Sequence, residues 1–192
     1  MNKGEIKAFF DALAPCWDEN QKRKDEIINF ILDKSDVSEG VRVLDVACGT
    51  GVLFGDYLSR GVSSVTGIDI SGEMLKVAEK KFPDVKLICA DAEEYVFTES
   101  YDVIMIYNAF PHFSDSDKLF FNLSKALKNA GRLTVAHGMS MKELEKCHSG
   151  SAIKVSLPLP ENEALAKIMS AYLDVDIQIS DDMMYMVSGT KK

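Results

Sequence analysis

The sequence has few cysteines, and their arrangement joins no distant segments together. Its four cysteines are far apart and form no C-x-x-C pair: Cys16, Cys48, Cys89 and Cys147. Structural zinc sites and the disulfide frameworks of small secreted domains both need cysteines at short, regular spacings. We therefore expect four free thiols, as in a protein of a reducing compartment.

Long apolar segments are missing as well. No stretch approaches the roughly 18 apolar residues that a membrane-spanning helix needs. The first residues do not combine a basic region with a following apolar region, which is the pattern of a secretory signal peptide. The chain is therefore predicted to be cytoplasmic and to have no membrane partner.

Positive charge is scarce relative to negative charge. The chain has 22 Lys and Arg against 30 Asp and Glu, a formal net charge of -8. Affinity for nucleic acids comes largely from Lys and Arg that neutralise phosphates, so DNA and RNA are not expected as partners. The length of 192 residues and the hydrophobic content of 46% predict one core, and hence a single domain over residues 1–192.

Short β-branched runs alternate with longer amphipathic stretches along the chain. This alternation is typical of βα units that build a mostly parallel sheet. Seven strands are predicted, at Val41–Ala47, Ser64–Asp69, Val85–Cys89, Asp102–Tyr107, Arg132–His137, Val175–Ser180 and Met183–Ser188.

Three helices are predicted between these strands, over Gly51–Ser59, Gly72–Lys80 and Ser116–Lys128. Ser71 is expected to cap the second helix, with Met74 at its N3 position, and Asp115 or Ser116 to cap the third. Gly131 is expected just beyond the third helix, in the left-handed conformation that often ends a helix.

The remaining segments are expected to differ from this alternation. Only Asp181 and Asp182 separate the last two strands, which is the spacing of a hairpin, so one antiparallel strand is expected at the end of the sheet. Met1–Lys34 is predicted to form one or two helices broken at Pro15, and Gly138–Pro160 is predicted to be irregular. Because open α/β sheets bind ligands beyond the carboxyl ends of their strands, these two segments are expected to provide a lid and a substrate pocket.

A buried strand runs into a glycine turn and then a helix at Val43–Gly51. Gly49 and Gly51 permit backbone conformations closed to other residues and a close approach by a ligand. With Gly55 the pattern is G-x-G-x-x-x-G, which differs from the G-x-G-x-x-G of dinucleotide enzymes. A tight turn without a ligand is the alternative interpretation of these glycines.

Two carboxylates follow the next two predicted strands. Asp69 ends the second strand, where it can accept hydrogen bonds from ribose hydroxyls. Asp91 follows the third strand, where it can accept from the exocyclic amine of adenine. The two acids together favour an adenosine-containing ligand.

With these motifs the sequence resembles the class I S-adenosylmethionine (SAM)-dependent methyltransferases, from about Phe9 to the C-terminus. Their small-molecule branch, such as quinone-type C-methyltransferases, has a cover over SAM similar to Phe10–Asp18. The resemblance implies a Rossmann-like, doubly wound α/β sheet in the order 3-2-1-4-5-7-6, and SAM converted to S-adenosylhomocysteine. It implies that the turn at residues 47–51 holds the methionine part and that Ile70 and Met74 enclose adenine. The cofactor residues predicted in this way are Phe10, Trp17, Asp45, Ala47, Gly49, Thr50, Gly51, Asp69, Ile70, Met74, Asp91, Ala92 and Asn108.

Methyl transfer from a sulfonium is an in-line displacement that needs alignment and exclusion of water, but no metal. Aromatic residues near the sulfonium can contribute cation–π attraction, although core packing is an equally simple role for them. The substrate pocket is predicted to include Tyr107, Phe110, His112, His137 and His148.

A general base would assist an acceptor that must lose a proton. His112 is the first candidate and His137 the second, with a structural role as the alternative for each. The three histidines are 25 and 11 residues apart, which matches no zinc signature, so no metal is predicted.

The activity predicted from the sequence is methyl transfer to a small-molecule acceptor by a monomer or homodimer. Two alternatives remain at this point. A SAM-binding module without catalysis would share the fold and the cofactor site. An NAD-dependent oxidoreductase would also place an acid after the second strand, but its glycine spacing differs.

Overall fold

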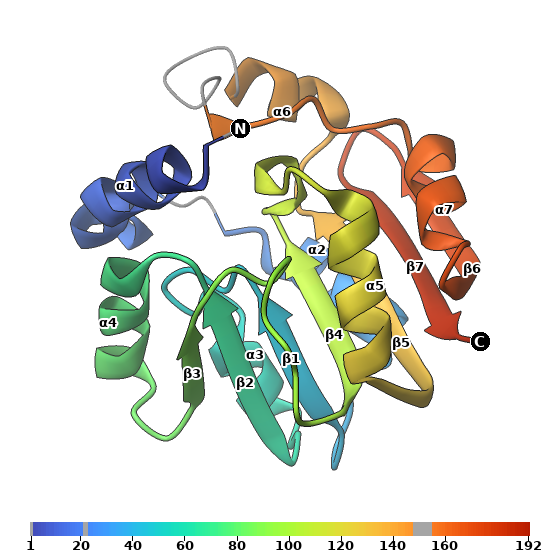
Figure 1. The fold of residues 1–192 in the computed structure, drawn as a ribbon, viewed down its shortest axis with the longest axis horizontal. Helices are drawn as coiled ribbons and strands as arrows, with labels where there is room; N and C mark the ends of the chain where they lie inside the picture. Colours follow the sequence, from blue (N-terminus) through green and yellow to red (C-terminus); the bar gives the residue numbers. More distant parts are fainter. Residues whose placement is uncertain (1, 21–22, 148–154) are drawn as a thin grey trace.

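Seven strands form one twisted sheet in the order β3-β2-β1-β4-β5-β7-β6 (Figure 1), as expected. The computed structural model describes residues 2–20, 23–147 and 155–192. The strands are β1 (Arg42–Val46), β2 (Ser64–Asp69), β3 (Lys86–Cys89), β4 (Tyr101–Tyr107), β5 (Leu127–His137), β6 (Leu173–Ser180) and β7 (Tyr185–Lys191).

Helices cover both faces of the sheet. One face is covered by α2 (Asp25–Lys34), α3 (Phe54–Ser59) and α4 (Gly72–Lys81), and the other by α5 (Ser116–Ala126) and α7 (Asn162–Met169). The other helical segments are α1 (Lys3–Leu13), η1 (Ala14–Cys16), η2 (Asp18–Asn20), η3 (Phe110–His112) and α6 (Met141–Cys147).

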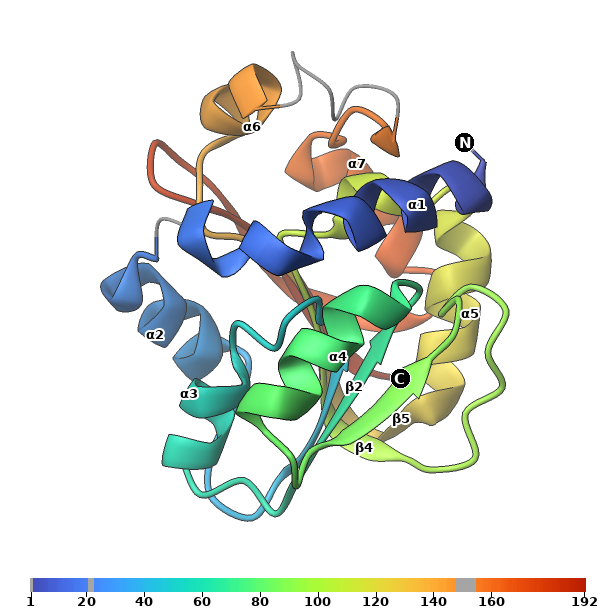
Figure 2. The ribbon, with the colours of Figure 1, turned by 90° about the vertical axis from the view of Figure 1, so that its left-hand side faces the viewer.

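The direction of the strands determines where a ligand can bind. The strands β1 to β5 are parallel, and β7 lies antiparallel between β5 and β6. The carboxyl ends of the parallel strands therefore meet at one edge, and α1 lies above this edge in both ribbon views (Figures 1 and 2). This is the edge at which open α/β sheets bind ligands.

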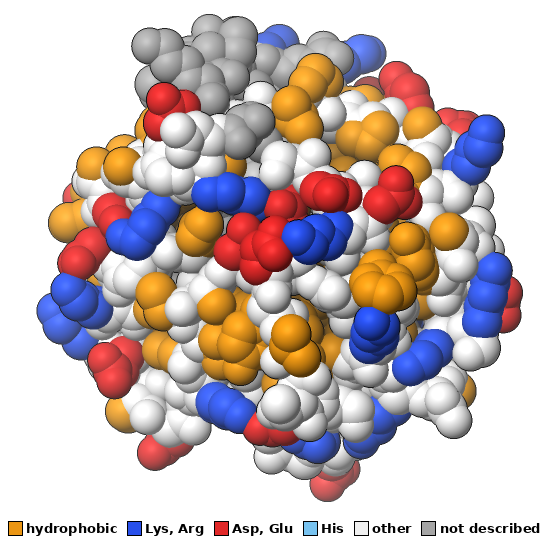
Figure 3. Space-filling model, viewed as in Figure 1, with side chains coloured by type: hydrophobic (Ala, Val, Ile, Leu, Met, Phe, Trp, Pro, Cys, Tyr) orange, Lys and Arg blue, Asp and Glu red, His pale blue; other side chains and the backbone are white. Residues whose placement is uncertain are grey.

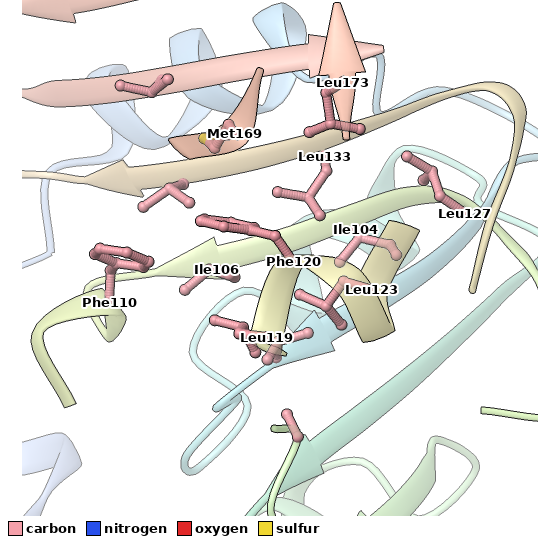
Figure 4. Packing of buried hydrophobic residues seen from close by; sticks show 14 of the residues in the cluster. Ile104, Ile106, Phe110, Leu119, Phe120, Leu123, Leu127, Leu133, Met169 and Leu173 are labelled. Atoms are coloured by element: carbon pink, nitrogen blue, oxygen red, sulfur yellow. The ribbon is translucent and has the colours of Figure 1, made fainter. Parts of the chain in front are cut away.

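The core on the α5 side explains why that helix forms where it does. Its buried positions, Leu119, Phe120 and Leu123, recur at helical spacing and pack on Ile104 and Ile106 of β4 (Figure 4). The Asp115 side chain caps α5 by accepting from the Lys118 backbone N–H at 2.9 Å. Ser71 caps α4 in the same way, with the Met74 N–H at 3.1 Å, which confirms both predicted caps.

Several predicted boundaries are corrected by the backbone. The first predicted helix begins at Phe54, because Gly51 has φ +76° and cannot be helical. The third ends at Ala126 and β5 follows at once, so Gly131 is no helix cap; Ala130 has the positive φ instead. A Cβ on Gly131 would lie 2.9 Å from the carbonyl oxygens of Asp102 and Lys128, so close backbone packing requires glycine there.

The C-terminal third differs most from the prediction. Residues 138–160, expected to be irregular, contain α6, and α7 was not predicted at all. The hairpin is wider than two residues, since β6 ends at Ser180 and β7 begins at Tyr185. Asp181 turns the chain by accepting from the backbone N–H groups of Met183 and Met184 at 2.8 and 2.9 Å.

Candidate cofactor and substrate cavity

A cavity lies between the carboxyl ends of the strands and the N-terminal segment. It encloses about 1110 Å³, a volume that includes the open solvent at its mouth. Twelve of the predicted site residues line it: Phe10, Trp17, Ala47, Gly49, Asp69, Ile70, Met74, Asp91, Ala92, Tyr107, Asn108 and His112.

The glycine turn after β1 forms part of the cavity wall. Ala47 and Gly49 have φ values of +55° and +54°, so the backbone turns sharply where the strand ends. A Cβ placed on Gly49 would meet no atom within 4 Å, which means that open space lies over this residue. On Gly51 it would lie 2.6 Å from the Phe54 ring, so this glycine is needed for packing and not for space in the cavity.

Asp69 joins the glycine turn to the start of α4. Its two carboxylate oxygens accept from the Gly49 and Ser71 backbone N–H groups, each at 2.8 Å. The side chain is 8% exposed, and burial raises the pKa of this carboxyl despite these hydrogen bonds. Each oxygen retains acceptor capacity for a ligand hydroxyl.

Asp91 lies at the end of the cavity beyond β3. Its Oδ1 accepts from the Glu93 backbone N–H at 3.0 Å, and Lys3 of α1 contacts its Oδ2 at 3.3 Å. Lys3 also pairs with the buried Glu93, which in turn accepts from the Ser114 and Asp115 N–H groups at 2.6 and 3.0 Å. This network ties the start of α1 to the loop that carries Asp91.

Asp45 lies in β1, beneath the turn, and is 2% exposed. Burial, reinforced by the nearby Asp69, raises the pKa of its carboxyl to about 8. The hydroxyl of the buried Tyr57 opposes this rise, because it interacts with the same carboxyl. Asp45, Thr50 and Gly51 therefore support the turn without lining the cavity.

The loop after β4 provides the opposite wall. Asn108 has φ +53°, and its side-chain oxygen accepts from the Gly138 N–H at 2.9 Å. A Cβ on Gly138 would lie 2.3 Å from the Tyr107 hydroxyl, so this glycine makes room for that side chain. The two loops after β4 and β5 are thereby held together beside the cavity.

His112 reaches the cavity from η3. Its Nδ1 lies 2.8 Å from the Val155 carbonyl oxygen and 3.2 Å from the Ser156 hydroxyl. Its ring meets the Phe10 ring edge to face, with centroids 4.8 Å apart. Because a carbonyl can only accept, the geometry favours the tautomer with the proton on Nδ1 and the lone pair on Nε2.

Two predicted pocket residues lie elsewhere. His137 is fully buried and does not line the cavity; its ring packs against Tyr185, 5.9 Å between centroids. Phe110 points into the core, where it stacks on Phe120 (Figure 4). His148 lies outside the described residues, as do the other members of 148–154.

Sequence reasoning also missed part of the lining. The residues not predicted are Lys3, Ile6, Arg23, Ile28, Cys48, Val52, Ile68, Ala90, Ala109 and Phe113. Lys3 and Ile6 share a helix face with the predicted Phe10, so helical spacing alone could have identified them. Arg23 carries no such signal; it is placed by contacts with the Val52 carbonyl at 2.9 Å and Asp56 at 2.5 Å.

Residues 2–20, 23–147 and 155–192 contain neither a metal-binding cluster nor a membrane-spanning helix. No group of three or more His, Cys, Asp or Glu side chains among these residues is arranged to hold a metal ion. None of the helices in that part of the chain has the length and apolar character to cross a bilayer.

Sequence comparison identifies relatives that share the part of the chain around this cavity. Residues 43–131 match the family model described as a methyltransferase domain. A malonyl-[acyl-carrier protein] O-methyltransferase of Priestia megaterium is 29% identical over 82% of this chain and 60% of its own length. A demethylmenaquinone methyltransferase of Renibacterium salmoninarum is 31% identical over 69% of this chain and 58% of its own length. The chain thus spans about 60% of the length of these curated relatives.

Solved structures share the fold at low sequence identity. A chain from the complex of the Haloferax volcanii Trm112 methyltransferase activator with a methyltransferase superposes with a TM-score of 0.78, at 18% identity, over 95% of this chain and 97% of that chain. A SAM-dependent methyltransferase of Mesorhizobium loti gives 0.71, at 16% identity, over 85% and 96%. Residues 43–131 thus match a methyltransferase domain, and the sheet order of this chain is that of the class I SAM-dependent methyltransferase fold.

Proposed function

We propose that this chain transfers a methyl group from SAM to a small-molecule acceptor bound in the same cavity. The observation that carries the proposal is the pairing of Asp69 with the open Gly49 turn in one cavity wall. A turn with free space above it admits a ligand, and the adjoining carboxylate can hold the hydroxyls of its sugar.

The charges of the site fit this cofactor. Asp69 lines the cavity, is buried, and forms no ion pair with a cationic side chain within the described residues. A buried carboxylate without a counter-charge favours a ligand that brings positive charge. SAM, when bound, supplies a methyl group on a positively charged sulfur and a positively charged amino group.

The chain's own side chains would align the reactants and exclude water. Phe10 and Trp17 meet edge to face, with centroids 5.7 Å apart, and Tyr107 of β4 lines the same cavity. Aromatic faces attract a positively charged sulfur centre and present no competing nucleophile. Enclosure by these rings would hold the acceptor in line with the bond that breaks.

His112 is the proposed base for an acceptor that loses a proton. It lines the cavity, and its Nδ1 faces the Val155 carbonyl, so Nε2 is the nitrogen with the lone pair. General-base assistance contributes typically about 10²- to 10⁴-fold to a rate. His137 cannot act as this base, because it is buried and does not line the cavity.

The acceptor is proposed to be a small molecule. Figure 3 shows acidic and basic side chains interspersed on the face seen in Figure 1, without a broad basic field for a polyanion. We infer that residues 1–34 act as the lid and residues 138–160 as part of the substrate pocket of one domain. We further infer a cytoplasmic enzyme that works as a monomer or homodimer.

The test is turnover of SAM to S-adenosylhomocysteine by the purified protein with a mixture of cellular metabolites. Mass spectrometry would identify any metabolite that gains one methyl group. His112→Ala is expected to slow that reaction at least about tenfold at neutral pH while cofactor affinity is kept. Unchanged turnover would remove the base role of His112.

Binding without turnover would favour the second candidate, a SAM-binding module without catalysis. One structural relative was solved with its Trm112 activator. The assay is therefore repeated with an activator protein before catalysis is rejected. Absence of SAM binding would contradict the proposal itself.

A further inference from the structure

The segment from α1 to η2, residues 3–20, forms a strap across the cavity. It contributes Lys3, Ile6, Phe10 and Trp17 to the lining, and it lies above the carboxyl edge of the sheet (Figures 1 and 2). Only Ile6 and Ala14 are fully buried within residues 3–19. Since little apolar surface is buried, polar contacts must contribute much of what holds the strap in place.

Two acids of the strap, Asp11 and Asp18, make these contacts. The Ser71 hydroxyl donates to Asp11 Oδ1 at 2.6 Å, and the Glu73 backbone N–H lies 3.3 Å from the same oxygen. The Thr50 hydroxyl donates to Asp18 Oδ1 at 2.6 Å, while Lys81 of α4 pairs with Asp18 Oδ2 at 2.7 Å.

Both hydroxyls come from the loops that Asp69 joins. Thr50 belongs to the glycine turn, and Ser71 caps α4. Asp69 accepts from the backbone N–H groups of Gly49 and Ser71. These contacts form a closed circuit. Hydrogen bonds link Asp11 to Ser71, Ser71 to Asp69, Asp69 to the glycine turn, and the glycine turn to Asp18. The backbone of the strap then connects Asp18 to Asp11.

Electrostatics keep the two strap acids charged. The Lys7 and Ser71 hydrogen bonds hold the pKa of Asp11 below its ordinary value. For Asp18, burial opposes ionisation, but Lys81 and Thr50 outweigh it, so its pKa is also lowered. Hydrogen bonds to ionised carboxylates are stronger than those between neutral groups.

On the basis of the proposed function, we infer that Asp11 and Asp18 are positioning residues that hold Phe10 and Trp17 over the bound cofactor. They thereby set how fast S-adenosylhomocysteine leaves. Phe10 precedes Asp11 in the chain and Trp17 precedes Asp18, so each acid fixes the aromatic residue beside it. Release requires the strap to lift, which breaks the circuit on both sides of the cavity.

The test compares the dissociation rate of S-adenosylhomocysteine from immobilised protein by surface plasmon resonance. Asp11→Ala and Asp18→Ala are each expected to release it about tenfold faster than the wild type, and the double variant faster again. Asp18→Asn keeps an acceptor for Thr50 and is expected to restore part of the slow release. Thr50→Val removes the same hydrogen bond from the other side.

A matched control is available on the same helix. Lys7→Ala removes the exposed ion pair with Asp11 (2.5 Å) but leaves the Ser71 contact, so release is expected to change less than twofold. Trp17 is the single tryptophan of the chain. In protein saturated with S-adenosylhomocysteine, acrylamide should quench its fluorescence more strongly in the two alanine variants than in Lys7→Ala.

The outcomes separate this inference from the proposed function. If the wild type binds no S-adenosylhomocysteine, the proposed function is contradicted. If the wild type binds it and both alanine variants release it at the wild-type rate, with unchanged Trp17 quenching, the strap inference is wrong and the proposed function stands.

Discussion

Buried charge is treated differently at the two ends of the sheet. Arg132 of β5 is 8% exposed, and all three nitrogens of its guanidinium donate hydrogen bonds: to Asp36 at 2.6 Å, to Asp176 at 2.7 and 2.9 Å, and to the Ser188 hydroxyl at 3.2 Å. Asp45 and Asp69 at the cavity end are buried as deeply, and no cationic side chain of the described residues pairs with them.

The difference separates a structural charge from a functional one. A charge removed from water must be compensated, either by the protein or by a ligand. At Arg132 the protein provides the compensation, and ion pairing raises the pKa of the guanidinium further. At the cavity end no side chain of the described residues provides it. Burial raises the pKa of Asp45, which lies beneath the turn, to about 8, and Asp69, which lines the cavity, is left for the ligand to compensate. Five variants sharpen or break this contrast.

Arg132→Met should lower the free energy of unfolding by about 2 to 3 kcal/mol, because it removes a nearly buried cation from its hydrogen-bond network. The half-exposed Asp36 and Asp176 can rehydrate, which limits the loss. Urea denaturation measures the effect. Cofactor affinity should stay within a factor of two, and a large loss of affinity would show that the two ends are not independent.

Asp69→Asn should weaken SAM binding about 100-fold with little loss of fold. The amide keeps one acceptor oxygen but turns its NH₂ group toward the N–H of either Gly49 or Ser71, so that contact is lost. Isothermal titration calorimetry gives the affinity, and circular dichroism checks the fold. Wild-type affinity in this variant would refute the role of the carboxylate.

Asp45→Asn should change how stability depends on pH. The ordinary pKa is 3.8 and the folded value is about 8, so between these values the folded chain retains a proton that the unfolded chain has released. The free energy of unfolding therefore falls as pH rises, by at most about 1.4 kcal/mol per pH unit. In the Asn variant this contribution is absent. Equal slopes for both proteins between pH 5 and 8 would contradict the raised pKa.

Gly49→Ala and Gly51→Ala distinguish the two glycines of the turn. Both have positive φ, so each alanine costs about 1 to 2 kcal/mol of backbone strain. Gly51→Ala should cost more stability, since its Cβ meets the Phe54 ring, whereas Gly49→Ala should mainly weaken cofactor binding. Thermal melting and calorimetry on the same samples compare them, and equal losses of affinity would argue against the open space over Gly49.

Much of the fold follows from local sequence signals. Alternating strands and helices and the Ser71 and Asp115 caps depend on residues close together in the chain, so they were predicted correctly. The hairpin after β6 was predicted as well, but its connection is longer than the two residues expected. The helix α7 was missed because Glu161 provides no side-chain cap and Pro158 and Pro160 dominate the preceding residues. The end of α5 was predicted at Lys128 and lies at Ala126. The chain turns at Ala130, a non-glycine residue at φ 59°, and no residue propensity predicts that conformation.

The site was predictable where a motif places residues at strand ends, and less so elsewhere. Asp69, Asp91 and Gly49 line the cavity as predicted. Each lies at or just after the carboxyl end of a parallel strand, and these ends meet at one edge of the sheet. His137 was misplaced because a strand end has two sides, and the sequence does not show which side faces Tyr185. Arg23 was missed because its contacts join segments far apart in the chain, whereas Lys3 could have been predicted from its helical spacing to Phe10.

The central claim is that the cavity of this chain binds SAM through the open glycine turn and the carboxylate of Asp69. Titration calorimetry of the wild-type protein with S-adenosylhomocysteine tests it most directly, with NADH as the comparison ligand. We predict one-to-one binding of S-adenosylhomocysteine and no heat from NADH. Saturable binding of NADH together with no response to S-adenosylhomocysteine would contradict the claim.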